Sequence, residues 1–158
     1  MMTMQVTRRW SGSVTHPYDT IPKGMDNASV GETIRVYNGT YVENVLVNRT
    51  VPLIGNGSSN TTIDGSGTGD VVRITSNWVN ITGFNVTNSG TSSQDAGMKI
   101  NNADNCTIES CEATLNQNGF YISRSPILRL RITPQTRTTI TASACLLRAT
   151  TTTSRGIS

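Results

Sequence analysis

Two pairs of charged residues are spaced so that they could bind or act on an acidic sugar. Asp70 lies three residues before Arg73, and Asp95 lies four residues before Lys99. If both pairs share one surface, they form a strip of alternating carboxylates and cations, the groups that acid–base chemistry on sugars requires. Asp in Gly-rich turns is also ordinary turn chemistry. The strip is therefore a carbohydrate-binding candidate, and no residue is assigned as catalytic.

The segments that would carry these residues belong to an internal repeat. The segment Trp78–Asn88 aligns without gaps with Asn105–Leu115, and Val51–Gly55 matches the start of both. A shorter pattern recurs as Val72-Arg-Ile74, Met98-Lys-Ile100 and Phe120-Tyr-Ile122. Because Arg73 and Lys99 take the same middle position, adjacent copies would place them about 5 Å apart, the spacing between strands.

Within each copy, apolar and polar residues alternate as in a strand with one buried face. The alternation slips at Thr82–Gly83 and at Glu109–Ser110, which predicts a bend that returns the next apolar residue inward. Such rungs must stack to form a core. We therefore predict an all-β parallel β-helix of about three rungs. Its inward columns would be Leu53, Ile81, Ile108 and Ile74, Ile100, Ile122.

The first part of the chain is expected to close this stack. Thr20 is a candidate N-cap and Pro22 falls in the first turn, so a short amphipathic capping helix is predicted at about 20–29. Residues 31–47 read as strand, a turn at Asn38–Gly39, then strand. The predicted domain boundaries are an irregular segment at 1–18 and the β-helix at 19–122.

The strings Ile21-Pro-Lys-Gly-Met-Asp-Asn-Ala28, Tyr37-Asn-Gly-Thr-Tyr41, Leu53-Ile-Gly55 and Thr62-Ile-Asp-Gly65 resemble right-handed parallel β-helix proteins. The NosD-like subgroup of archaeal and bacterial surface proteins is the most similar. This resemblance implies the right-handed fold and, for NosD-like proteins, a periplasmic copper-maturation role. The opening motif is shared with pectin lyases, which use clustered acids with calcium and a basic residue, and with pectin esterases, which pair two Asp with an Arg. Further polar candidates for such chemistry are Glu43, Asp64 and Gln94, but no paired-Asp esterase motif appears.

The copper role finds no ligand cluster in the sequence. Copper sites gather His, Cys or Met at ligand spacing, whereas His16 is the single His and lies outside the repeats. Cys106 and Cys111 fall on inward positions, where Cys acts as a small hydrophobe. We therefore predict no metal site and no cofactor.

The composition changes at residue 123. All fifteen Asn and all ten Asp and Glu lie before it, while residues 123–158 hold six Arg and nine Thr. Residues 1–122 carry seven Lys or Arg against ten acids, a net charge of −3, and the tail adds +6. The basic tail lacks aromatic residues, which argues against nucleic-acid binding. We predict that 123–158 is a non-native or disordered tail, and that a shifted reading frame could explain it.

The sequence features that bear on export point in different directions. Three Cys do not form a disulfide framework, and no apolar run is long enough to span a membrane. A signal peptide is missing from this chain and would lie upstream. Asn-X-Ser/Thr triplets are dense and suit a glycosylated surface, although a chain rich in Asn and Thr also contains many such triplets by chance. The candidates are Asn38, Asn48, Asn56, Asn60, Asn80, Asn85 and Asn105.

From these observations we expect a non-enzymatic β-helix module at the cell surface, a fragment serving structure or carbohydrate adhesion. Its partners would be polysaccharides or other surface components, bound by Asp70, Arg73, Asp95 and Lys99. Trp78 could stack on a sugar ring, although sealing the core edge is the favoured role. An uncapped last rung could promote end-to-end self-association. The alternatives are a lyase- or esterase-like polysaccharide-modifying enzyme and a copper-maturation accessory protein.

Overall fold

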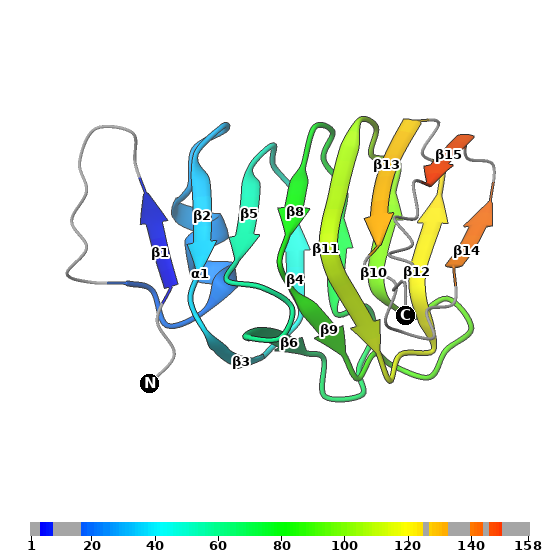
Figure 1. Cartoon of the computed structure of the whole chain (residues 1–158), viewed down its shortest axis with the longest axis horizontal. Coiled ribbons are helices and arrows are strands. Elements are labelled where there is room, and N and C mark those ends of the chain that lie inside the picture. The colour runs from blue at the N-terminus through cyan, green and yellow to red at the C-terminus, as the bar shows by residue number, and fades with distance from the viewer. Residues whose placement is uncertain (1–3, 8–16, 125–126, 133–139, 144–145, 150–158) are drawn as a thin grey trace, which may run out of the picture.

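The computed structural model describes residues 4–7, 17–124, 127–132, 140–143 and 146–149. The chain winds into a parallel β-helix whose rungs follow one another along the long axis, from β1 at the N-terminal end to β14 and β15 at the other (Figure 1). Each complete rung contributes one strand to each of three parallel sheets, here called A, B and C. The predicted fold is confirmed.

Sheet A runs along the near side in Figure 1. It contains β1 (Met4–Thr7), β2 (Thr33–Val36), β5 (Pro52–Gly55), β8 (Asn80–Thr82), the first half of β11 (Cys106–Thr114), β13 (Ile127–Ile132) and β15 (Leu146–Ala149). Strand β1 is antiparallel to β2, and the later strands pair in parallel.

Sheets B and C complete each rung. Sheet B holds β3 (Gly39–Val42), β6 (Thr61–Asp64), β9 (Asn85–Thr87) and the second half of β11. Sheet C holds β4 (Val45–Val47), β7 (Val72–Ile74), β10 (Ala96–Asn101), β12 (Asn118–Ser123) and β14 (Ile140–Ser143). Sheet C carries the charged residues predicted to bind sugar, so its register positions the candidate site.

The predicted inward columns are present. Leu53 pairs with Ile81 and Ile81 with Ile108 in sheet A, while Ile74 pairs with Ile100 and Ile100 with Ile122 in sheet C. All six side chains have no exposed surface. The alternation of apolar residues therefore encodes the core directly, because a strand with one buried face repeats every two residues.

The corners of the rungs use residues with positive φ, which turn the chain tightly. Gly83 has φ 79° and Ser110, its counterpart one rung later, has φ 51°, so both predicted slips are bends. The same column begins at Gly55, whose added Cβ would lie 3.0 Å from the Gly83 carbonyl carbon. Stacked backbones approach too closely there for a side chain on Gly55.

The sequence analysis found one corner of the first rung and missed another. The Asn38–Gly39 turn joins β2 to β3, as predicted, but these strands belong to different sheets. A second corner at Glu43–Asn44 then leads into β4. A turn motif marks where a strand ends, but it does not indicate that the next strand starts a new sheet.

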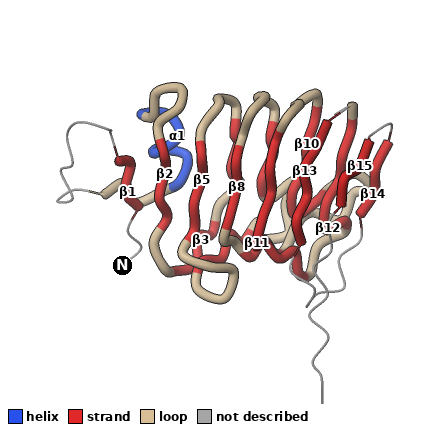
Figure 2. Tube along the Cα trace, turned by 45° about the horizontal axis from the view of Figure 1, so that its top comes forward, coloured by secondary structure: helices blue, strands red, loops and turns tan. Residues whose placement is uncertain are grey.

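Helix α1 (Ile21–Asn27) packs at the N-terminal end behind β2 (Figure 2). Thr20 is its N-cap, as predicted, and its hydroxyl accepts the Lys23 N–H at 3.4 Å. Ile21 and Met25 are buried against the first rung. At the other end of the helix, the Arg49 guanidinium donates to the Ala28 carbonyl at 2.6 Å. The capping helix predicted at about 20–29 is thus confirmed, three residues shorter than expected.

Beyond residue 123 the described backbone continues the strand pairing. Strand β13 pairs with β11, Cys106 standing opposite Leu128 and Ile108 opposite Leu130, and β14 pairs with β12. Most of the predicted tail, including Cys145, lies outside the described residues. The domain boundaries, the altered reading frame and the self-association of the last rung stay predictions.

Candidate functional site

The outer face of sheet C carries a column of side chains that register brings together. Leu46 stands opposite Arg73, Arg73 opposite Lys99, and Lys99 opposite Tyr121 on four successive strands. These residues alternate with the inward core positions, so they point away from the core. The sequence analysis placed Arg73 and Lys99 on adjacent rungs in this way, and we call the column the sheet C strip.

Asp70 meets this strip from the turn before β7. Its Oδ2 lies 3.5 Å from Lys99 Nζ, and its Oδ1 accepts the Ala96 N–H at 3.2 Å. The two charged side chains are only 10% and 14% exposed. Burial raises the pKa of Asp70 above its usual value, while Lys99, the Ala96 N–H and Arg73 pull that pKa back down. The carboxylate is thus fixed, desolvated and close to two cations.

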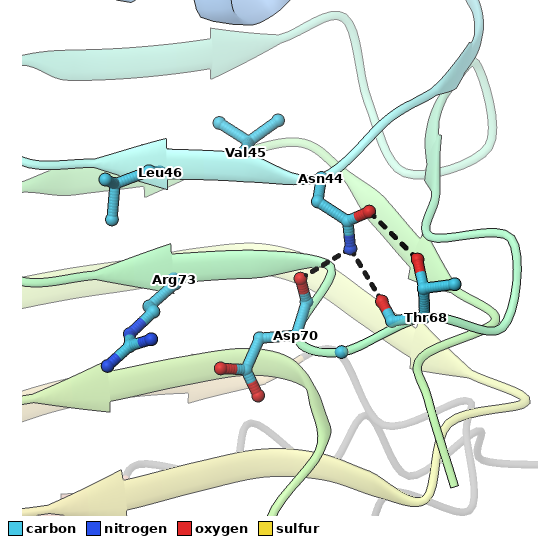
Figure 3. Close-up of a pocket in the computed structure, with 7 residues that line it drawn as sticks. Asn44, Val45, Leu46, Thr68, Asp70 and Arg73 are labelled. Atoms are coloured by element: carbon cyan, nitrogen blue, oxygen red, sulfur yellow. Dashed lines mark hydrogen bonds between the residues drawn. The ribbon is translucent and has the colours of Figure 1, made fainter.

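A shallow open depression of about 400 Å³ lies beside Asp70, between the first two rungs of sheet C (Figure 3). Leu46 and Arg73 line it from the strands, and Asn44, Thr68 and Asp70 line it from the turns. The Asn44 amide donates to the carbonyls of Thr68 and Asp70 at 2.8 and 2.7 Å, which holds the rim together. The side chains of Arg73 and Asp70 point to the same side, away from Asn44.

The two cations of the strip differ in availability. Arg73 is exposed, and no hydrogen bond or ion pair joins its guanidinium to another residue of the described ranges. Lys99 instead donates to the Gln94 carbonyl at 3.1 Å and lies 5.2 Å from the centre of the Tyr121 ring, besides pairing with Asp70. An anionic ligand would therefore meet Arg73 first.

Three predicted acidic candidates have local structural partners instead. Asp95 Oδ2 accepts the Ser92 N–H at 3.0 Å within the loop before β10. Asp64 accepts the Asn88 amide at 3.0 Å and the Ser66 N–H at 2.8 Å in a corner of sheet B. Glu43 accepts the Ile21 N–H at the start of α1, at 2.8 Å. Of the predicted acids, only Asp70 pairs with a cation of the strip.

Trp78 lies apart from the strip, in the corner that leads into β8 of sheet A. It is 66% exposed and has φ 59°, and its backbone N–H donates to the Asp104 carbonyl at 2.9 Å. The indole therefore does not seal the core edge, and it lies on a different sheet from Arg73 and Lys99. Its stacking on a sugar stays a prediction for a second surface.

The two described cysteines lie in the core. Cys106 and Cys111 have no exposed surface, and burial raises the pKa of both thiols, that of Cys111 to about 12. A protonated thiol is a poor metal ligand because metals bind the thiolate. Among the described residues, no three His, Cys, Asp or Glu are grouped to hold a metal ion. His16 lies outside these residues.

The glycosylation candidates differ in how their amides are used. Asn38 and Asn56 bond to each other, Asn60 donates to the Asn56 carbonyl, and Asn85 accepts the Thr114 hydroxyl. Asn48 and Asn80 are exposed, whereas Asn105 is half-buried. Glycosylation of all of them stays a prediction.

Four residues of the strip and its rim were not found from the sequence: Tyr121, Leu46, Asn44 and Thr68. Tyr121 could have been, since it takes the same place in Phe120-Tyr-Ile122 as Lys99 in Met98-Lys-Ile100. Leu46 lies in the Val45-Leu-Val47 segment, which pairs with Val72-Arg-Ile74. Asn44 carries no comparable signal, because its contacts depend on the path of the Thr68–Asp70 turn.

No family model matches this sequence, and no curated protein matches it. Solved structures do match the fold. A pectin methylesterase in complex with a hexasaccharide aligns with a TM-score of 0.62 and 17% identity, over 78% of this chain and 47% of the enzyme. The pectin methylesterase of Yersinia enterocolitica aligns with a TM-score of 0.56 and 16% identity over 73% and 48%. The enzyme PemA of Erwinia chrysanthemi gives 0.54 and 14% over 78% and 48%.

These comparisons correct the functional expectation. The structures that share the fold are enzymes named for a polysaccharide substrate, so preferring a non-enzymatic module was wrong and the polysaccharide-modifying alternative is better supported. At this low identity the likeness establishes the fold alone. The chain spans about half the length of the pectin methylesterases it matches. In the described part of the chain, no helix is long and apolar enough to cross a membrane.

Taken together, the register of sheet C and the matching structures place this chain among proteins with the parallel β-helix fold.

Proposed function

We propose that this chain forms the substrate-binding rungs of an enzyme that modifies a polysaccharide, with the sheet C strip as its binding face. The observation that carries the proposal is that an exposed Arg73 and a desolvated Asp70 line the same open depression. A guanidinium offers a planar set of donors that suits carboxylate and carbonyl oxygens. The apolar side chain of Leu46 beside it suits the less polar face of a sugar ring.

The two residues have complementary roles in ester hydrolysis. The Asp70 carboxylate can take a proton from water as the water oxygen bonds to the ester carbon, and Arg73 can stabilise the charge that develops on the carbonyl oxygen. When the bond to the alcohol breaks, Asp70 returns the proton to the leaving oxygen. A carboxylate whose pKa is raised by burial is better matched to this task near neutral pH.

The matching structures support the substrate class, since they are pectin methylesterases and one of them is complexed with a hexasaccharide. The second Asp that the resemblance to pectin esterases implies has no counterpart in the strip among the described residues, because Asp95 bonds within its own loop. The rungs seen here would therefore supply the binding face and one acid–base group. An extracellular or cell-surface location fits this proposal and the dense glycosylation triplets.

Titration calorimetry of the folded chain with a methyl-esterified galacturonate hexasaccharide tests the binding face. We expect binding that weakens at least about tenfold in Arg73→Met, because a hydrogen-bonded charge contributes about 1.5–3 kcal/mol. The matched control is Arg35→Met, which removes another exposed Arg, from the outer face of sheet A. Equal affinity of both variants, or no binding by the wild type, would contradict the proposal.

Methanol release from the same ester, followed against time, tests the chemistry separately. We expect slow release by the wild type and at least a hundredfold less by Asp70→Asn, in line with the usual contribution of an acid–base residue. If Asp70→Asn releases methanol as fast as the wild type, Asp70 is not the acid–base group.

A further inference from the structure

We propose that Lys99 is a positioning residue, which fixes the Asp70 carboxylate from the next rung and is itself held by Tyr121 and the 89–95 loop. The sequence analysis treated Lys99 as a sugar-binding cation, and this inference gives it a different role. The inference rests on the proposed function only in that Asp70 is taken as the acid–base group. The placement of the lysine stands on contacts alone.

Lys99 Nζ meets partners from three separate parts of the fold. It lies 3.5 Å from Asp70 Oδ2 in the turn before β7 and 3.1 Å from the Gln94 carbonyl oxygen in the loop before β10. The Tyr121 ring of β12 lies 5.2 Å away, within the range of a cation–π contact. An ammonium has three donors and no acceptor. Two oxygens and a ring face already surround the Lys99 ammonium, so few of its donors remain for a ligand.

The burial of Lys99 agrees with this role. An exposed lysine keeps its flexible stem and hydrated ammonium in water, whereas Lys99 is only 14% exposed although it points outward from the sheet. Immobilising such a side chain has an entropic cost of up to about 2 kcal/mol. The ion pair and the ring contact of Lys99 must offset that cost, so these contacts determine where the side chain lies.

The loop that supplies the Gln94 carbonyl is fixed from both sides. The Asn118 amide, one rung later, donates to the Ser93 and Asp95 carbonyls at 3.0 and 2.9 Å. On the side of the preceding rung, the loop residue Gly90 lies so close to Gly69 that a Cβ added to Gly90 would lie 2.6 Å from the Gly69 nitrogen. The loop thus holds the carbonyl that orients Lys99.

The charged groups acting on Asp70 come from two strands. Lys99 faces Asp70 from β10 and Arg73 from β7, the strand that follows the Asp70 turn, and both lower the pKa that burial raises. On β12, the group next to Lys99 is the Tyr121 ring, and the loop acid Asp95 is turned to the Ser92 N–H. Removing Lys99 therefore leaves burial opposed by fewer positive charges, and Asp70 should hold its proton to a higher pH.

A carbon-13 NMR titration of the aspartate carboxyls tests this directly, with the Asp70 signal assigned by its loss in Asp70→Asn. In Lys99→Met we expect the Asp70 pKa to rise by at least about one pH unit, the usual effect of losing a close opposite charge. Lys99→Arg should restore most of the difference. The control is Lys23→Met, which removes an exposed lysine paired with Asp19, and it should leave Asp70 unchanged.

A second pair of variants keeps both charges and guards against misfolding. Tyr121→Phe retains the ring and should titrate like the wild type, whereas Tyr121→Leu loses the ring contact and should raise the Asp70 pKa part of the way. An unchanged Asp70 titration in folded Lys99→Met would overturn the inference, as would identical titrations of the two Tyr121 variants and the wild type.

The failure of this inference is distinguishable from failure of the proposed function. Shifted titrations without any hexasaccharide binding would retain the positioning role and reject the substrate. In the opposite case, binding and methanol release would persist in Lys99→Met with an unmoved pH profile, and Lys99 would then have no positioning role.

Discussion

At the scale of single residues, the corner between sheets A and B depends on how closely two backbones approach. Gly83 has φ 79°, and a Cβ built there would lie 2.7 Å from the Gly55 carbonyl oxygen and 3.0 Å from the Gly57 nitrogen. Both atoms belong to the backbone and cannot rotate away. The same corner one rung later accepts Ser110 at φ 51°. Equivalent positions of the repeat therefore differ in whether they tolerate a side chain, because the backbone of the preceding rung lies at a different distance from each.

We accordingly expect Gly83→Ser to destabilise the protein although serine occupies the equivalent place in the next rung. A positive φ costs an L-residue about 1–2 kcal/mol, and the contact with Gly55 adds to that. Urea unfolding would measure the change, with Ser110→Gly as the reciprocal control; it relieves a positive φ and should therefore not destabilise the protein by more than about 0.5 kcal/mol. Equal stability of Gly83→Ser and the wild type would show that the corner can relax.

At the scale of elements, the second corner of the first rung and the capping helix are joined through one carboxylate. Glu43 accepts the Ile21 N–H, one of the unpaired donors in the first turn of α1. Burial raises the pKa of Glu43, the Ile21 N–H lowers it in part, and Asp19 raises it further. The helix is thus anchored by a group that is harder to ionise in the folded state than in the unfolded chain.

The sign of the pH dependence follows from that raised pKa. Between the unfolded and folded values, the native state binds more protons, so the stability from Glu43 is complete below the unfolded pKa and is lost as pH rises through the folded one. Urea unfolding from about pH 4 to 8 should show that the free energy of unfolding of the wild type falls relative to that of Glu43→Gln as pH rises. Relative to Glu43→Gln, Glu43→Ala should lose about 1 kcal/mol at all pH values, as for a removed helix cap, because neither replacement titrates.

Asp19 offers a control of opposite sign. Lys23 lowers the pKa of Asp19 through a side-chain hydrogen bond, so its contribution is present at neutral pH and lost as pH falls. Asp19→Asn should therefore show the reverse trend from Glu43→Gln. If both variants follow the wild type in parallel across the range, neither carboxyl is coupled to folding.

Sequence patterns predicted the elements well and the site only in part, for a physical reason. A column such as Leu53, Ile81 and Ile108 is encoded by alternation within each strand, a local property. Lys99 was placed on the right surface by the same logic. Its contact with the Gln94 carbonyl was not predictable, because it depends on the path of a loop fixed by the distant Asn118. Strand register is a repeating property, whereas each loop has its own geometry.

At the scale of the whole molecule, each rung is stabilised mainly by its two neighbours. Ile81 of β8 packs in a column between Leu53 and Ile108, and all three are fully buried. A solenoid of this kind has a stability close to the sum of rung and interface contributions. With only a few rungs, no half of the stack buries enough apolar surface to persist alone, so the molecule should unfold as one unit.

Ile81→Ala tests that cooperativity, since it opens a cavity at the middle of the stack. We expect a loss of about 2–5 kcal/mol and a lower urea midpoint with an unchanged slope, because the same total surface is still exposed on unfolding. Ile54→Ala, on the outer face of the neighbouring strand and half-buried, is the matched truncation and should cost much less. Unfolding should be followed both by circular dichroism and by amide exchange, and the two transitions should be compared. Two transitions, with amides of β2 and β5 protected after those of β10 and β12 have exchanged, would show that the rungs on either side of Ile81 fold independently.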